Sequence, residues 1–103
     1  MNIRLALAAT SLLLTTPAFA LDGAKLYQEK TCWSCHGKDA KKTLTPAYPR
    51  LAGQNAAYAE AQMKDIKSGA RNNGQTAAMK AIMHLVSDEE MRTIANWIGT
   101  LQK

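Results

Sequence analysis

Two cysteines and a histidine lie close together in the first half of the chain, in the order Cys32-Trp33-Ser34-Cys35-His36. This C-x-x-C-H spacing is typical of covalent haem attachment. The two intervening residues let the chain curl so that both thiols reach neighbouring vinyl groups of a porphyrin, and the next residue places an imidazole beneath the iron. The motif therefore predicts one haem c bound through Cys32 and Cys35, with His36 as the first axial iron ligand.

Closely spaced cysteines also occur in two other kinds of site, a disulfide or dithiol redox centre and a zinc centre. A thioredoxin-like centre lies in a β-α-β pattern, whereas no segment here alternates with a period of two over the length of a strand. A tetrahedral zinc centre needs a fourth ligand besides the motif, and His84 is the only other histidine. Haem attachment is the favoured interpretation.

A second axial ligand is expected among the methionines, because a His/Met pair gives a six-coordinate iron with a raised reduction potential. Four methionines follow the motif: Met63, Met79, Met83 and Met91. Methionine on the apolar face of a helix commonly serves core packing, which suits Met63 and Met91. The spacing alone does not choose between Met79 and Met83, and His84 is an alternative that would give a bis-His site of lower potential.

The first twenty residues have the pattern of a secretory signal peptide. Arg4 supplies positive charge, an apolar run extends from Leu5 to Leu14, and Ala18-Phe19-Ala20 has the small-residue pattern of a cleavage site. The run is shorter than the roughly twenty residues that span a bilayer. We expect cleavage after Ala20, export to the periplasm, and one domain formed by residues 21–103.

The formal net charge of +5 describes a modestly basic chain. The sequence lacks the dense basic run that favours nucleic-acid binding, so nucleic acid is not an expected partner. Lys38, Lys41 and Lys42 follow the haem motif, where they either surround an exposed haem edge and steer an acidic redox partner or belong to a solvated loop. Trp33 and Tyr48 either bond a haem propionate or pack near the haem.

Helix-capping signals divide the rest of the chain into helices and loops. The expected helices begin at Asp22, Asn55, Thr76 and Ser87, the last with a capping box in Ser87-Asp88-Glu89-Glu90. The first two are expected to run to about residues 30 and 68. Between them, residues 37–53 hold two prolines and a polar run that indicate a surface loop. The elements predict an all-α domain with a loop able to wrap a cofactor.

The whole chain after residue 20 resembles the small class I cytochromes c of bacteria. The resemblance is carried by Gly23 and Tyr27, the haem motif, Pro49-Arg50-Leu51-Ala52-Gly53-Gln54, Tyr58 with Gln62-Met63, and Met79 ahead of Ser87-Asp88-Glu89-Glu90. It implies a class I cytochrome c fold, in which three to four helices wrap one covalently bound haem.

The resemblance also implies contacts around that haem. The first and last helices cross, with Gly23 and Tyr27 near Trp97. The Pro49 carbonyl accepts a hydrogen bond from His36, and Leu51 packs on the haem. Met79, rather than Met83, is the second iron ligand, because the ligand methionine of the family lies shortly before the capped last helix.

An iron with His36 and Met79 on its two faces has no open position for a substrate, so the expected function is single-electron transfer without catalysis. We expect a periplasmic carrier that takes electrons from a dehydrogenase or quinol-oxidising complex and passes them to an oxidase or reductase. The alternative is a haem subunit bound to a periplasmic oxidoreductase as its electron relay. A ligand-binding or peroxidase-type cytochrome, a third class, needs an open iron position.

Overall fold

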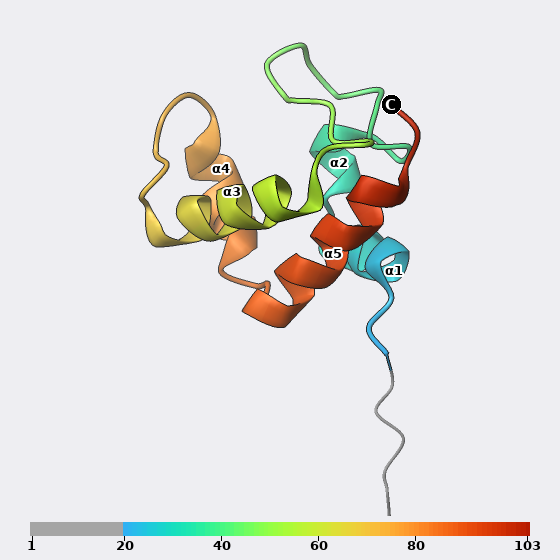
Figure 1. The fold of residues 1–103 in the computed structure, drawn as a ribbon. Helices are drawn as coiled ribbons and strands as arrows, with labels where there is room; N and C mark the ends of the chain where they lie inside the picture. Colours follow the sequence, from blue (N-terminus) through green and yellow to red (C-terminus); the bar gives the residue numbers. More distant parts are fainter. Residues whose placement is uncertain (1–19) are drawn as a thin grey trace, which may run out of the picture.

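The computed structural model describes residues 20–103, so the expected signal peptide lies outside the described residues except for Ala20. The described residues form five helical segments and no strand: α1 (Gly23–Glu29), α2 (Trp33–His36), α3 (Ala56–Ser68), α4 (Thr76–Met83) and α5 (Asp88–Thr100). Figure 1 shows α3 and α5 crossing side by side, with the loop that follows α2 above them. The all-α prediction is confirmed. Within residues 20–103, no helix has the length and apolar character needed to cross a membrane.

Three helices begin at the predicted capping residues. The side chain of Asp22 accepts a hydrogen bond from the Lys25 N–H at 3.2 Å, and that of Asn55 accepts one from the Tyr58 N–H at 3.0 Å. These bonds satisfy backbone donors that have no partner inside the helix. The expected starts of α1 and α3 are therefore correct to within one residue.

The start of α5 is a complete capping box. The N–H of Glu90 donates to Ser87 Oγ at 3.1 Å, and the N–H of Ser87 donates to Glu90 Oε1 at 2.9 Å. The predicted cap of α4 was wrong by one residue, because Gln75 precedes the helix and Thr76 is its first residue. The Thr76 hydroxyl instead donates to the Asn73 carbonyl at 2.7 Å, within the preceding turn.

The core forms where α1 and α3 pack against α5. The buried side of α5 consists of Met91, Ile94, Ala95 and Ile98. At the α1 crossing, a Cβ atom on Gly23 would lie 2.7 Å from the Thr93 carbonyl oxygen and closer still to Trp97 Cβ. The rings of Tyr27 and Trp97 have centroids 4.9 Å apart. The expected crossing of the first and last helices, with Gly23 and Tyr27 at Trp97, is confirmed.

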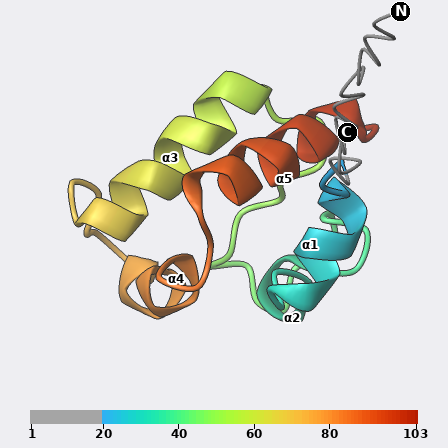
Figure 2. The same ribbon diagram turned by 90° about the horizontal axis from the view of Figure 1, so that it is seen from below.

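The helix α4 lies apart from this crossing and packs on α3. Figure 2 shows α4 on one side and α1 with α2 on the other, while α3 and α5 run across both. The short link 84–87 connects α4 to α5. This arrangement places the haem motif and the helix that carries Met79 and Met83 on two sides of the domain.

Candidate functional site

A cavity of about 610 Å³ opens among α2, α3, α4 and the loop after α2. Its volume falls in the range of small-molecule and cofactor sites, about 300–1,000 Å³. Aliphatic and aromatic side chains dominate the walls, and Ile94 and Ile98 of α5 form part of the lining. A large apolar hollow in a domain this small indicates a site for a bulky apolar group.

The haem motif forms one wall of the cavity. It folds into the single helical turn α2, in which the N–H of His36 donates to the Cys32 carbonyl at 3.0 Å. Gly37 ends the turn with φ of +88°, a conformation that favours glycine. Cys32, Cys35 and His36 all line the cavity as a result. The sequence predicted that the motif curls, but α2 was not counted among the expected helices.

The two thiols are free and half-buried. Burial raises the pKa of the Cys32 thiol to about 11, so a free thiol at this position stays protonated at neutral pH. A reactive dithiol centre needs the opposite, a thiolate favoured by a lowered pKa. Within residues 20–103, no three His, Cys, Asp or Glu side chains group closely enough to hold a metal ion. The cavity wall is thus unlike a dithiol redox centre or a zinc centre.

The imidazole of His36 has a fixed orientation. Its Nδ1 atom lies 2.9 Å from the Pro49 carbonyl oxygen, and the residue is 8% exposed. Burial lowers the pKa of His36, while the bond to Pro49 opposes that shift. A neutral ring that donates from Nδ1 leaves its Nε2 lone pair free to bind a metal. The hydrogen bond implied by the family resemblance is therefore present in the structure.

The loop after α2 is tied to the motif and to itself, and this holds Pro49 in place. The N–H of Leu44 donates to the Cys35 carbonyl at 2.9 Å. The carbonyl of the fully buried Ala40 accepts from the N–H groups of Leu51 and Ala52, at 2.9 and 3.1 Å. Leu51 itself is half-buried and lines the cavity, as Pro49 does. The loop therefore fixes the position of the Pro49 carbonyl that orients the ring of His36.

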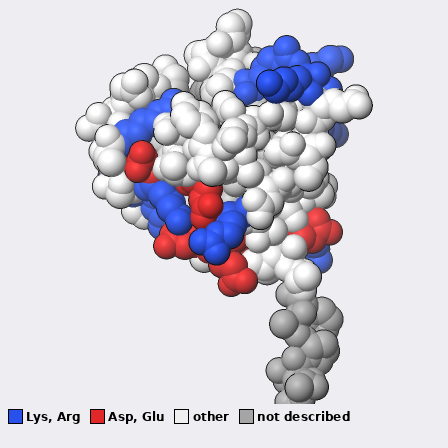
Figure 3. All heavy atoms as spheres, viewed as in Figure 1, with Lys and Arg blue, Asp and Glu red and all other residues white. Residues whose placement is uncertain are grey.

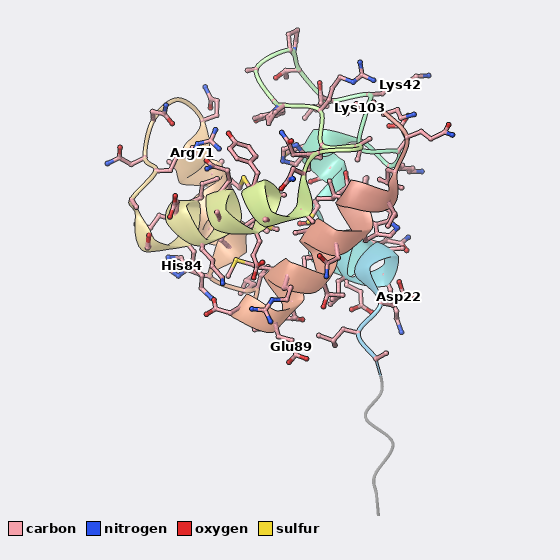
Figure 4. All side chains as sticks on the ribbon, viewed as in Figure 1. Asp22, Lys42, Arg71, His84, Glu89 and Lys103 are labelled. Carbon is pink, nitrogen blue, oxygen red and sulfur yellow. The ribbon has the colours of Figure 1, made fainter. Side chains whose placement is uncertain are left out.

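Methionines from two helices line other parts of the cavity: Met63 of α3, and Met79 and Met83 of α4. Met83 is only 1% exposed and belongs to the core, whereas Met79 is half-buried and packs at its edge. Met91 is fully buried and does not line the cavity, in agreement with the packing role expected for it. His84 is exposed and also lies outside the cavity lining (Figure 4).

The cavity contains polar groups to which the sequence analysis assigned no role. Arg50 and Arg71 line it, and Arg71 Nη1 donates to Gln62 Oε1 at 3.0 Å. Arg71 is an isolated arginine in a polar turn, so no motif in the sequence indicates that it lines the cavity. Tyr48 lines the cavity, whereas Trp33 does not. Guanidinium groups in a largely apolar wall are suited to the carboxylates of a bound group.

Lys38, Lys41 and Lys42 do not line the cavity. Lys38 and Lys41 border a smaller hollow of about 230 Å³ together with Trp97 and Leu101. The Asp39 carboxylate accepts hydrogen bonds from the N–H groups of Lys41 and Lys42, both at 2.9 Å. These lysines therefore do not surround the cavity, and they belong to the loop beside it.

The donors around the cavity fit a haem c. Two thiols and an imidazole share one wall, and thioether sulfurs occupy another. The remainder is mainly apolar, with two guanidinium groups and several uncharged polar side chains. The thiols would attach the porphyrin, His36 would bind its iron, and the arginines would meet its propionates. When bound, the haem supplies an iron that gains and loses one electron.

Comparison with known proteins identifies similar sequences over nearly the whole described chain. The family model described as Cytochrome c matches residues 20–102. Cytochrome c-551 of Pseudomonas aeruginosa is 37% identical over 91% of this chain and 90% of its own length. Cytochrome c-554(548) of Halomonas halodenitrificans is 42% identical, over 68% of this chain and 83% of its own length. A thiosulfate dehydrogenase electron acceptor of Stutzerimonas stutzeri is 40% identical, but the match spans only 41% of that longer protein.

Proposed function

The chain belongs to the cytochrome c family, and from that premise we propose that it is a freely diffusing periplasmic carrier whose haem iron is ligated by His36 and Met79. Haem c is bound covalently in this family, and the chain transfers electrons rather than catalysing a reaction of its own. The observation that carries the ligand proposal is that His36 of α2 and Met79 of α4 line one cavity from separate elements.

The residues of the cavity have distinct tasks in electron transfer. Cys32 and Cys35 retain the cofactor, and the Pro49 carbonyl holds the His36 ring with Nε2 free for iron. Ile94 and Ile98 help to exclude water, which lowers the local dielectric, disfavours the more positive oxidised iron and so raises the reduction potential. Met79 would complete the coordination of the iron and leave no open position for a small molecule.

Burial favours Met79 over Met83 as the second ligand. Met83 is 1% exposed and its side chain is packed in the core, whereas Met79 is half-buried at the edge of the core. The two residues are one turn apart on α4, so they lie on the same helical face. The less confined side chain is the better candidate to bind a group that fills the cavity.

Spectra of the oxidised protein test this assignment, because a thioether–iron bond has its own charge-transfer band. We expect Met79→Ala to lose the band and to bind carbon monoxide rapidly when reduced, while Met83→Ala keeps the band. A band that survives in Met79→Ala would rule out Met79 as the ligand. Rapid binding of carbon monoxide by the unmodified reduced protein would favour a ligand-binding cytochrome instead.

The periplasmic location is supported by the pattern of residues 1–20. We propose that these residues direct export and are removed, leaving the domain 21–103. The N-terminal sequence of the protein purified from the periplasm tests this, and it should begin at Leu21. An N-terminus that retains the apolar run would contradict the proposed cleavage.

Partner recognition is supported by the charge distribution. Lys38, Lys41, Lys42 and Lys103 form what we call the basic face, which takes part in none of the ion pairs of residues 20–103. Figure 3 shows a cluster of basic side chains at the upper edge, where Figure 4 labels Lys42 and Lys103, while both signs of charge mix along the lower edge. We propose that the basic face steers an acidic redox partner.

The proposed donor is a dehydrogenase or a quinol-oxidising complex, and the proposed acceptor is an oxidase or reductase. One relative is named as the electron acceptor of a dehydrogenase, which supports the first kind of donor. Electron-transfer rates should fall with ionic strength, and Lys42→Glu should slow transfer more than Lys25→Glu on α1. Equal effects of the two reversals would contradict a role for the basic face.

The alternative function is a haem subunit that remains bound to a periplasmic oxidoreductase. Size-exclusion chromatography of the native periplasmic extract separates the two functions. A free carrier should elute at the size of a small domain, whereas co-elution with a larger catalytic chain would overturn the free-carrier proposal.

A further inference from the structure

The link between α4 and α5 is held by two lysines that come from different helices. Lys30, at the end of α1, donates from Nζ to the Leu85 carbonyl at 2.8 Å. Lys67, in the last turn of α3, donates from Nζ to the Val86 carbonyl at 2.6 Å. Two ammonium groups that are 37 positions apart in the sequence therefore bind consecutive carbonyls, an arrangement we call the lysine clamp.

The two carbonyls of the link differ in their access to water, since Leu85 is 67% exposed and its bond to Lys30 is exposed as well. The N–H groups of Leu85 and Val86 donate back to Ile82 and Met83, so the end of α4 satisfies the donors of the link. Val86 is 1% exposed, which places its backbone in a region with little access to water. A buried carbonyl without a donor is costly, and a charged donor forms a stronger hydrogen bond than a neutral one. Lys67 supplies such a donor to the buried Val86 carbonyl, and Lys30 supplies a charged donor to the exposed Leu85 carbonyl.

The clamp also connects the link to the start of α5. Lys30 Nζ lies 3.5 Å from Glu90 Oε2, and the other carboxylate oxygen of Glu90 bonds the N–H of Ser87 in the capping box. Lys67, by contrast, forms no ion pair in the described part of the chain, and its bond to Val86 is partly buried. The link is thus tied to α1 and the α5 cap on one side and to α3 on the other.

The helix α4 depends on these ties because its main packing partner among the helices is α3. It is eight residues long, contributes both Met79 and Met83 to the cavity, and ends directly before the link. Short helices with few packing partners are the elements that open first in a folded domain. A small shift of α4 would move its thioether sulfurs away from the position at which one of them would bind a haem iron.

We propose that Lys30 and Lys67 are positioning residues that hold α4 where its methionine can ligate the haem iron. This inference rests on the proposed His/Met ligation, but it does not depend on which of the two α4 methionines is the ligand. The lysines touch neither the cavity nor the cofactor site, and they act through the backbone of residues 85 and 86.

The test uses Lys30→Met and Lys67→Met in the haem-loaded protein, because methionine keeps an unbranched apolar stem and removes the ammonium. Matched controls are Lys25→Met on α1 and Lys64→Met on α3, whose lysines pair with the exposed Glu29 and the half-buried Glu60. All four variants remove one positive charge, so long-range effects on the iron are similar. The thioether–iron band and the helical circular dichroism are followed in parallel during heating.

We expect both clamp variants to lose the band at a lower temperature than they lose helical signal, with Lys67→Met the more affected. The reduced clamp variants should bind carbon monoxide roughly tenfold faster than the controls, because loss of a charged hydrogen bond raises the open population by about that factor. Lys67→Arg, which keeps a charged donor, should restore the band toward its normal thermal stability.

The positioning role would be overturned if the clamp variants lost the thioether–iron band and the helical signal together, at the same temperatures as the controls. So would equal rates of carbon monoxide binding in Lys67→Met and Lys64→Met. Failure of the ligation proposal has a different signature, since the band would then survive in both Met79→Ala and Met83→Ala. If a clamp variant has already lost its helical signal at room temperature, Lys67→Arg replaces it in the test. Failure of Lys67→Arg to keep the band would also count against the proposal.

Discussion

The Nδ1 atom of His36 donates to the carbonyl oxygen of Pro49 at 2.9 Å, across a loop that starts immediately after the haem motif. The same loop is pinned by the bond from the Leu44 N–H to the Cys35 carbonyl and by the two bonds to the Ala40 carbonyl. The imidazole therefore has one tautomer and one orientation imposed on it by backbone groups. Its metal-binding nitrogen is selected before any iron is bound.

This hydrogen bond predicts slow solvent exchange of the His36 Nδ1 proton. The ring is buried and bonded, whereas the other histidine, His84, is exposed and serves as an internal control. We expect the His36 ring N–H to persist in nuclear magnetic resonance spectra of histidine-labelled, reduced protein, while the ring N–H of His84 is lost to exchange. Exchange at equal rates would show that the Pro49 bond is not maintained in solution.

Gly23→Ala should destabilise the domain by about 1–3 kcal/mol, the usual range for overpacking. The added Cβ meets Trp97 and the Thr93 carbonyl at the helix crossing, and the higher helix propensity of alanine offsets only part of that cost. Gly99→Ala on α5 is the matched control, since its Cβ would find its nearest contact at 3.4 Å, the Gln54 carbonyl. Denaturant unfolding should show the control neutral or slightly stabilised, and a similar loss in both variants would contradict the close crossing.

Tyr27→Phe should lower the free energy of unfolding by about 1 kcal/mol, as expected for one lost hydrogen bond. The Tyr27 hydroxyl donates to the Gly37 carbonyl, next to His36, and Tyr27 itself is 2% exposed. Tyr58→Phe removes a hydroxyl from an exposed tyrosine and is expected to change little. Unfolding in guanidinium chloride measures the free energy of unfolding of both variants. A neutral Tyr27→Phe would mean that water replaces the hydroxyl.

The ionisation of Glu90 is expected to make part of the free energy of unfolding depend on pH. The hydrogen bond from the Ser87 N–H, aided by the nearby Lys30 ammonium, lowers the pKa of Glu90 below its ordinary value. A carboxylate with a lowered folded pKa stabilises the protein above its unfolded pKa of about 4.3, and this contribution disappears as the pH falls through the folded pKa. Glu90→Gln should therefore be less stable than the unmodified protein at neutral pH.

The difference between Glu90→Gln and the unmodified protein should shrink on acidification. Urea unfolding at about pH 7 and about pH 3 measures it on both sides of the ordinary carboxyl pKa. Glu89→Gln removes a charge from the same turn of α5 without disturbing the capping box, and it reports the effect of the helix dipole alone. A difference that stays constant with pH would show that the Glu90 charge adds nothing to the cap.

The haem motif and most helix caps could be predicted from the sequence because they are local features. The cysteine and histidine positions of the haem motif lie within five residues, and each cap joins a side chain to a backbone group three positions away. Such bonds depend on spacing and on little else, which is why the starts of α1, α3 and α5 could be predicted. The error at α4 has the same origin, because Thr76 has the chemistry of a cap but its hydroxyl is used in the turn before the helix.

The sequence by itself determined the haem motif, the helical class and most helix starts, because those features are encoded over a few neighbouring residues. The tertiary structure decided which distant residues share the cavity. It brought Arg71 and three methionines to the cavity wall, left Lys38, Lys41 and Lys42 outside it, and joined Lys30 and Lys67 to one link. These contacts join residues tens of positions apart and follow from how α1, α3 and α5 pack. They therefore cannot be predicted from local patterns in the sequence.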